Sequence, residues 1–423
     1  MRSSTLSGRH NMITTSHAPP ASRLPPSAPD DEADAPDATF PTPTFPFDGV
    51  RLPPPLGGGT GARTILVRAL VAILVAWVPL AVLSAVEGLA IGPTRRESFL
   101  FDVAAYARFL IALPLLILAE RVALPLLGHI VRHLARPELL PASERPRYEA
   151  LVALASRLVR SPLAAMAMIA LAYGATLQAA QAAYPADVAT WVTPTAAGDR
   201  ALSLAGMWRT FVSQPLYVVL VLMWLWRAAV WGIFLRKVSR LDLQLVASHP
   251  DHMGGLQFVM ASLKGFAPVA FALAVGIAGG IASRVLVEGT RVTEFAPVVG
   301  VVVAVLLVLF VGPLFALRKP LKRVRTRAIF SYGRLASGVG YHFEREWLRP
   351  GEDVPADALQ AQEFSVTTDL YSLVANANTV KGVPIDLKGV VPLIVATLLP
   401  FVPLALFEMP LAQLLKLLVG FVV

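Results

Sequence analysis

The stretch ILVRALVAILVAWVPLAVLSAV, residues 65–86, decides the fold of this chain. It holds 22 residues, and Arg68 is its only charged side chain. As a helix it would measure about 33 Å, which is enough to cross a hydrocarbon layer of roughly 30 Å. The stretch therefore predicts a transmembrane helix.

Six further apolar stretches repeat this pattern. The chain is 55% hydrophobic and 15% charged, whereas soluble domains carry about 25% charged residues. We therefore predict an all-α polytopic helical membrane protein with seven transmembrane helices and a helical cytoplasmic segment. The other six predicted spans are residues 103–128, 163–183, 211–235, 266–287, 296–317 and 389–407.

The distribution of positive charge predicts the orientation of the spans. With the N-terminus inside, the inner segments carry 27 Lys and Arg residues and the outer segments carry 5. Positive residues favour the cytoplasmic side, so we predict a multi-pass protein of the bacterial cytoplasmic (inner) membrane with a cytoplasmic N-terminus. The same arrangement explains the pI of about 10.0 by attraction to anionic lipids, without nucleic acid.

The soluble-looking segments divide the chain into four parts. Residues 1–62 contain twelve prolines, and we expect a disordered cytoplasmic tail; Met1 and Met12 both remain candidate starts. Residues 63–318 hold the first six spans and 319–388 a cytoplasmic helical segment. Residues 389–423 hold the seventh span and an interfacial C-terminal helix, and the stretch 409–423 is too short to span upright, so a re-entrant course stays open.

The segment 319–388 begins with a helix of mixed character. An apolar residue recurs every three or four positions, which is typical of one buried helix face. Gly338 and Gly340 predict a break in this helix, 356–375 predicts a second one, and Asp386 is a candidate cap for the seventh span. The apolar stripe consists of Leu321, Val324, Ala328, Tyr332, Leu335, Val339, Phe343 and Trp347, and the early cations are Arg318, Lys319, Lys322, Arg323, Arg325 and Arg327.

Residues 248–255, SHPDHMGG, carry the densest chemistry in the chain. The favoured interpretation is a helix start, because Ser248 and Asp251 have capping-box spacing and Pro250 fits a first helical turn. The alternative is a metal site, with His249, Asp251 and His252 as ligands, joined by His129 and His133 from one face of a helix. A co-chaperone J-domain is rejected, because a predicted span precedes the His-Pro-Asp tripeptide.

This box lies in a longer stretch, RLDLQLVASHPDHMGGLQF at 240–258. Together with YHFEREW at 341–347 and the block 364–418, it resembles an uncharacterised family of bacterial multi-pass membrane proteins. Those proteins carry a His-Pro-Asp-x-x-Gly-Gly-Leu box between two spans. The resemblance covers 65–418 and implies no catalytic residue, because the family has no known activity.

Ionisable and amide side chains inside spans are costly and mark candidate functional positions. Arg68, Arg108, Arg227 and Arg284 lie within reach of a membrane face and are expected to snorkel, and Glu120 is a candidate partner for Arg227 across the bundle. A polar lining of a vestibule is the alternative role, with Glu120, Gln178, Gln181, Arg227 and Arg284 as its candidates. Gly276 and Gly280 predict a close-packing face, and the two halves of the chain show no clear internal repeat.

We expect no cofactor and no catalytic residue, because nucleotide-binding and hydrolase motifs are missing. The chain has no cysteine, which excludes thiolate metal sites. The leading functional hypothesis is a non-enzymatic membrane scaffold or accessory subunit with a protein partner or a second copy of itself. The alternatives are a secondary transporter or channel for a small solute and, less favoured, a metal-dependent enzyme at the cytoplasmic face.

Overall fold

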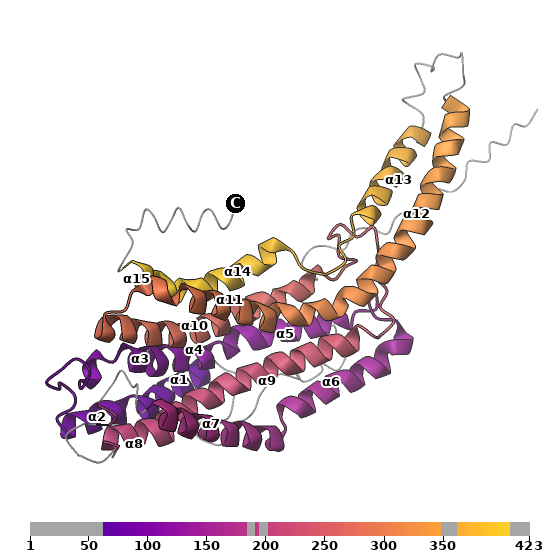
Figure 1. Cartoon of the computed structure of the whole chain (residues 1–423). Coiled ribbons are helices and arrows are strands. Elements are labelled where there is room, and N and C mark those ends of the chain that lie inside the picture. Colours follow the sequence, from indigo (N-terminus) through magenta and orange to yellow (C-terminus); the bar gives the residue numbers. More distant parts are fainter. Residues whose placement is uncertain (1–61, 184–190, 194–201, 348–361, 407–423) are drawn as a thin grey trace, which may run out of the picture. The chain divides into compact units, whose positions relative to one another are not determined.

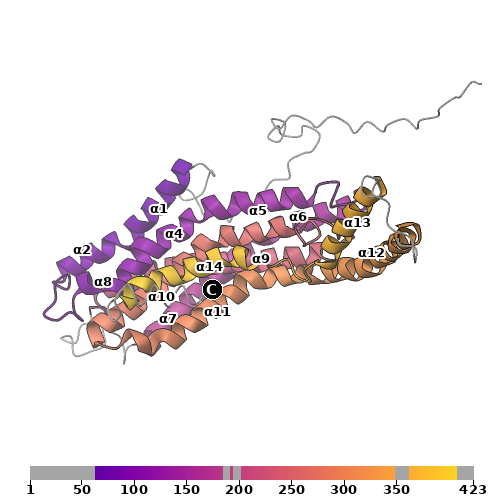
Figure 2. The same cartoon turned by 90° about the horizontal axis from the view of Figure 1, so that it is seen from above.

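The computed structural model describes residues 62–183, 191–193, 202–347 and 362–406. All regular structure in these ranges is helical, and the helices run side by side in Figures 1 and 2. The predicted Pro-rich tail and the predicted interfacial helix at 409–423 lie outside the described residues.

The prediction of seven spans is confirmed. Within the described residues, seven helical stretches are long and apolar enough to cross a membrane. They are Arg63–Val86, Val103–Leu134, Ala142–Ala180, Leu204–Val238, Gln257–Glu288, Val292–Trp347 and Leu387–Ala405.

Most spans are built from several helical pieces, because prolines and short π- or 3-10 turns interrupt them. The first span comprises α1 (Ala62–Ala76) and α2 (Val78–Val86), and the second comprises α3 (Val103–Ala105), η3 (Tyr106–Ala112), α4 (Leu113–Leu118) and α5 (Glu120–Leu134). The third span comprises α6 (Arg145–Val159) and α7 (Pro162–Ala183). The fourth span comprises α8 (Leu204–Trp208), η6 (Arg209–Ser213) and α9 (Gln214–Val238). The fifth span comprises η7 (Gln257–Met260) and α10 (Ala261–Glu288). The sixth comprises α11 (Ala296–Val311), η9 (Gly312–Leu317) and α12 (Arg318–Trp347). The seventh comprises α14 (Leu387–Leu398), η11 (Leu399–Phe401) and α15 (Val402–Ala405).

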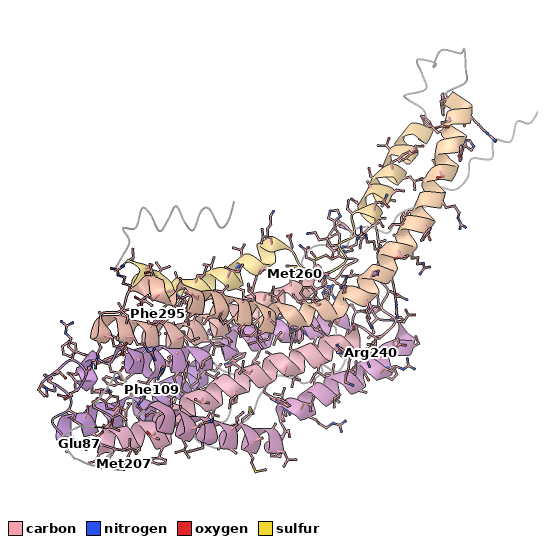
Figure 3. The ribbon with its side chains drawn as sticks, in the orientation of Figure 1. Glu87, Phe109, Met207, Arg240, Met260 and Phe295 are labelled. Atoms are coloured by element: carbon pink, nitrogen blue, oxygen red, sulfur yellow. The ribbon has the colours of Figure 1, made fainter. Side chains whose placement is uncertain are left out.

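The two ends of the bundle differ in charge. Arg240 and Met260 lie at the end where α9 finishes and α10 begins, and we call it the basic end (Figure 3). Glu87 and Met207 lie at the other end, which we call the opposite end (Figure 3). Because successive spans run in opposite directions, the sixth span runs toward the basic end, and α12 begins there.

Helix α10 is the central helix of the bundle. In its most apolar stretch 67% of the residues are buried, compared with 17% in the third span. A side chain at Gly279 would collide with Ala107 of η3, and one at Gly276 would collide with the Tyr217 hydroxyl of α9. Glycine therefore lets three spans approach closely, as the sequence predicted, although Gly279 rather than Gly280 makes the tightest contact.

The kink in the first span is held by side chains of the fourth. Pro79 has no N–H, so the Val75 carbonyl four residues earlier lacks its helical donor. The Trp208 indole nitrogen donates to this carbonyl at 3.0 Å. The Ser213 hydroxyl donates to the adjacent Ala76 carbonyl at 2.7 Å. The fourth span thus satisfies the polar backbone that the kink exposes in the membrane-crossing part of the first span.

Aromatic donors meet proline-associated carbonyls at two further kinks. Each carbonyl again lies four residues before a proline, and each donor comes from a neighbouring helix. Tyr173 Oη donates to the Phe211 carbonyl before Pro215 at 3.0 Å, and Trp226 Nε1 donates to the Leu158 carbonyl before Pro162 at 3.0 Å.

The second and fourth spans begin with the same structural motif, which we call the opening motif. Asp102 caps α3 by accepting from the Ala105 N–H, and Ser203 caps α8 by accepting from the Gly206 N–H. In both spans an arginine follows six residues after the cap, a π-helical turn ends ten residues after it, and a proline follows at twelve. The second and fourth spans therefore share a local motif, and the absence of a repeat between the two halves of the chain stays a prediction.

Helix α12 continues the sixth span and pairs with α13 (Gln362–Asn378); both views show the two helices side by side (Figures 1 and 2). The predicted break at Gly338 and Gly340 is wrong, because α12 is continuous to Trp347. Gly340 instead faces the Tyr371 hydroxyl of α13. The apolar stripe is confirmed in part, since Leu321 and Ala328 are buried but Leu335 is exposed.

Asp386 lies at the N-cap position of α14 but makes no side-chain cap bond. Its carboxylate accepts a hydrogen bond from Lys381 Nζ at 3.0 Å instead. This hydrogen bond is the main reason why the pKa of Asp386 lies below its usual value. The predicted capping role is therefore positional only.

Candidate functional site

A buried Arg–Glu–Arg triad joins three spans. Glu120, the first residue of α5, accepts from Arg68 Nη1 of α1 at 2.9 Å through Oε2. Its other oxygen, Oε1, accepts from Arg227 Nη2 of α9 at 2.8 Å. The predicted pairing of Glu120 with Arg227 is confirmed. The expectation that Arg68 and Arg227 snorkel away from the bundle is wrong, because their side chains are only 11% and 2% exposed.

The environment of Arg227 is apolar and aromatic. Its side chain is 2% exposed, and the guanidinium lies 4.8 Å from the centre of the Trp224 ring, which suits a cation–π contact. Within the described part of the chain, the Nε atoms of Arg68 and Arg227 are buried without a hydrogen-bond partner. The triad carries two positive charges against one negative charge, so it is a charged joint between the first, second and fourth spans.

The remaining candidates for a polar lining do not gather around this triad. Gln178 is exposed on α7, and Arg284 is exposed on α10. The side chain of Gln181 lies outside the described residues. The structure therefore brings Glu120 and Arg227 together with Arg68 and leaves Gln178 and Arg284 on the surface of the bundle.

The stretch SHPDHMGG forms a folded loop rather than a helix start, so the capping-box interpretation was wrong. The first helical turn, η7, begins at Gln257. His252, Gly254 and Gly255 all have positive φ values, of 54°, 65° and 90°, which a right-handed helix excludes. Gly254 and Gly255 adopt these left-handed turns without the steric clash that a side chain would cause.

Asp251 organises this loop. Its Oδ1 accepts from the N–H groups of Met253 at 2.8 Å and Gly255 at 3.1 Å, and its Oδ2 accepts from that of Gln257 at 3.1 Å. Partial burial of the carboxyl raises its pKa, but these three bonds and the neighbouring His249 together hold the pKa of Asp251 below its usual value. The carboxylate is thus a structural acceptor for the backbone.

The two histidines of the loop face different partners. His249 Nδ1 lies 2.8 Å from Asp251 Oδ1. His252 Nδ1 lies 2.7 Å from Thr379 Oγ1, and the His252 carbonyl accepts from the Lys381 N–H at 2.8 Å. The loop is therefore tied to the segment between α13 and α14.

The proposed histidine ligands do not converge on one point. His129 is exposed on α5, and the His133 ring packs on Phe258 with 4.2 Å between ring centres. Among the residues that the structure describes, no group of three His, Cys, Asp or Glu side chains is arranged to hold a metal ion. Asp251 already accepts three backbone bonds, so it serves the loop.

Sequence reasoning missed a polar latch at the opposite end of the bundle. Trp191 Nε1 donates to Asp102 Oδ2 at 3.1 Å, and the Ser203 hydroxyl donates to the Trp191 carbonyl at 2.8 Å. Trp191 thus links the caps of both opening motifs. Glu87 adds a third tie, accepting from the Leu204 N–H at 2.7 Å. One sequence signal could have pointed to these contacts: the capping residue, the arginine and the proline have the same spacing in the second and fourth spans.

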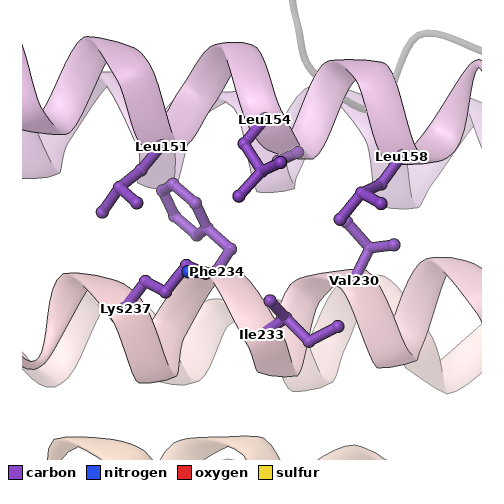
Figure 4. A pocket seen from close by; sticks show the side chains of 8 residues that line it. Leu151, Leu154, Leu158, Val230, Ile233, Phe234 and Lys237 are labelled. Atoms are coloured by element: carbon purple, nitrogen blue, oxygen red, sulfur yellow. The ribbon is translucent and has the colours of Figure 1, made fainter.

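The crevice between α6 and α9 is a packing seam (Figure 4). Its walls are aliphatic and aromatic side chains, with Lys237 at the rim. They are Leu151, Leu154, Ala155, Leu158, Val230, Ile233 and Phe234. No convergent polar groups stand there to orient a ligand.

A scan against protein-family models finds no match to the chain, and searches of curated proteins and of solved structures find none either.

Proposed function

We propose that this membrane protein is a non-enzymatic scaffold of the bacterial inner membrane that docks a partner protein on the hairpin α12–α13, with its N-terminus in the cytoplasm. One observation carries the proposal: α12 extends beyond the hydrocarbon layer and exposes large apolar side chains. The sixth helical stretch, Val292–Trp347, has 56 residues, whereas about 20 suffice to cross a bilayer.

The exposed apolar side chains of α12 lie on a shared face. Phe330 is 74% exposed and Tyr341 is 69% exposed. They are eleven residues apart, which is close to three full helical turns. Exposed apolar clusters of this kind mark protein-interaction sites. Further exposed apolar residues of the hairpin are Ile329, Leu335, Tyr371 and Leu373.

Charge indicates the chemistry of the partner. From Arg325 to Phe343 the sequence contains three arginines and no acidic residue. Arg334 lies one turn from Phe330 on the same face and is exposed. An amphipathic helix with carboxylates flanking its apolar side chains complements this surface. The proposed partner is therefore an acidic amphipathic segment of another protein.

Site-specific photo-crosslinking tests the proposal. A photoreactive amino acid at Phe330 or Tyr341 should yield one protein adduct in intact cells, and mass spectrometry should place the linked peptide in an acidic amphipathic helix. The same group at Val308, which is 73% exposed on α11, is the matched control and should yield no such adduct.

Reversing the charge at Arg334 (Arg334→Glu) should weaken binding of the purified partner, whereas Arg334→Lys should retain it. Adducts from Phe330 that join only two copies of this chain, or only lipid, would contradict the proposal.

Transport of a small solute is the second candidate function. The buried triad of Arg68, Glu120 and Arg227, together with proline kinks in several spans, is the observation that favours it, since charged residues at membrane depth and interrupted helices recur in transporters. Flux of a solute into proteoliposomes that stops in a folded Glu120→Gln variant would support transport over the scaffold.

A further inference from the structure

We infer that six cations at the basic end form a binding surface for the phosphate headgroups of anionic lipids, and we call this surface the basic collar. It consists of Lys264, Arg318, Lys319, Lys322, Arg323 and Lys388. It shares no residue with the proposed docking surface and stands independently of it.

Four of the six cations lie at the point where the sixth span leaves the apolar zone. Helix α12 begins at Arg318, directly after the apolar α11 and η9. From Arg318 to Arg323 the helix rises about 7.5 Å, which compares with a headgroup layer of roughly 5–7 Å on each side of the hydrocarbon. The cations therefore occupy the depth at which lipid phosphates lie.

The other two cations lie at the starts of α10 and α14, which meet. A side chain at Gly389 of α14 would collide with the end of Met260, directly before α10. Lys388 adjoins this contact, and Lys264 follows it by one helical turn. Both lysines are exposed, so the starts of the fifth and seventh spans add two positive charges at the same end.

The orientation of the collar side chains is fixed by their neighbours. Leu317, Pro320 and Leu321 are buried against the bundle, so Arg318, Lys319, Lys322 and Arg323 point away from it and are exposed. Phe315 is 53% exposed on the apolar side of these cations. Phe315 thus lies on the side where acyl chains would be, and the collar cations lie on the side where lipid phosphates would be.

The collar cations are not held in ion pairs by the described residues. Within the described ranges, none of the six makes an ion pair or a hydrogen bond through its side chain, although Arg145, Arg147 and Lys381 at the same end each pair with a carboxylate. Cations close to an anionic leaflet each gain roughly 1 kcal/mol from its surface potential. Lipid phosphates are therefore the ions that complete this surface.

The test measures which lipids stay bound to the purified full-length protein. The protein is exchanged into micelles with equal amounts of phosphatidylglycerol and phosphatidylcholine, and native mass spectrometry counts the lipids retained. The wild-type protein should enrich phosphatidylglycerol, and each neutralised collar cation should lower the enrichment about fivefold until no preference remains. The variant in which all six collar cations are replaced by Gln should therefore show none.

Two controls keep the result interpretable. Arg96→Gln/Arg284→Gln/Arg291→Gln removes exposed cations at the opposite end and should retain the enrichment. Lys319→Arg/Lys322→Arg keeps the charge and should retain it too, which separates loss of charge from loss of fold. The inference would be overturned if the variant lacking all six cations kept the enrichment, or if the opposite-end variant lost it. It would also be overturned if millimolar inorganic phosphate displaced the bound lipid and abolished the enrichment.

Discussion

The Trp208 indole donates a hydrogen bond to the Val75 carbonyl across the interface of two spans, at 3.0 Å. The bond exists because Pro79 cannot donate to that carbonyl. Replacing Trp208 with Phe should lower the free energy of unfolding by about 1–3 kcal/mol, since it leaves a carbonyl of a membrane-crossing helix without a partner. Thermal or denaturant unfolding of the purified protein in detergent measures the change.

A double-mutant cycle isolates this bond. In the Pro79→Ala background an N–H returns to the helix, so Trp208→Phe should cost less than it does in the wild-type chain. Trp226→Phe, whose indole serves the distant Leu158 carbonyl, is the matched control and should cost the same in both backgrounds. Equal costs for Trp208→Phe in the two backgrounds would refute the role assigned to Pro79.

The buried triad predicts a large effect at Glu120. Replacement by Ala leaves two guanidinium groups facing each other without their shared carboxylate, and breaking a buried ion pair in this way costs about 3–5 kcal/mol. Arg284→Ala, at an exposed position of α10, should change stability little. The measurement is again unfolding in detergent, and similar losses for both variants would contradict the structural weight given to the triad.

The Asp251 carboxylate should make the stability of the folded protein depend on pH in the acid range. Its pKa in the folded protein is lowered, so the charged carboxylate stabilises the fold above the unfolded pKa of about 3.9. This contribution is lost as the pH falls through the lower folded pKa. Wild-type stability should therefore decline more steeply below about pH 4 than that of Asp251→Asn. Asp369→Asn, exposed on α13, should keep the wild-type pH profile when melting temperatures are compared.

Gly279 and Gly300 give a matched pair of glycine substitutions. A methyl group at Gly279 would collide with Ala107, whereas one at Gly300 of α11 meets nothing within 4 Å. Gly279→Ala should therefore destabilise the protein by about 1–3 kcal/mol through overpacking. Gly300→Ala should be neutral or stabilising by up to about 1 kcal/mol, because alanine favours the helix. Equal melting temperatures for the two variants would argue against close packing of α10 on η3.

The proposed orientation is open to direct labelling, because the chain has no cysteine of its own. Single cysteines at Arg291 and Arg325, both exposed and at different ends of the bundle, form the pair to compare. A membrane-impermeant maleimide added to spheroplasts should label Arg291→Cys and spare Arg325→Cys until the membrane is opened. The reverse pattern would place the N-terminus outside.

The spans were predictable because hydropathy is a property of the local sequence. The predicted first span, 65–86, falls within the helical stretch Arg63–Val86. The pairing of Glu120 with Arg227 was also accessible, since buried charges in spans seek counter-charges. The prediction for Arg68 was wrong because the sequence shows only where this residue lies along its own span. It does not show which neighbouring helix faces the residue.

The loop SHPDHMGG shows a second limit of sequence reasoning. Ser248 and Asp251 have the spacing of a capping box, yet Asp251 bonds to Gln257, six residues onward. The turns at His252, Gly254 and Gly255 compete with the helix and are stabilised by Thr379 and Lys381, more than 100 residues away. The carbonyls that lie four residues before a proline could be predicted only in part. The sequence identifies the carbonyl that lacks its helical donor, but only the packing of the helices shows which side chain replaces that donor.

The opening motifs of the second and fourth spans have a consequence for the symmetry of the molecule. Both begin at the opposite end and run in the same direction, from Asp102 and from Ser203. A related pair with the same polarity cannot be exchanged by turning the protein upside down in the bilayer. Within the first four spans the two membrane faces are therefore chemically inequivalent: one meets two capped π-turns joined through Trp191, and the other meets the ends of α5 and α9.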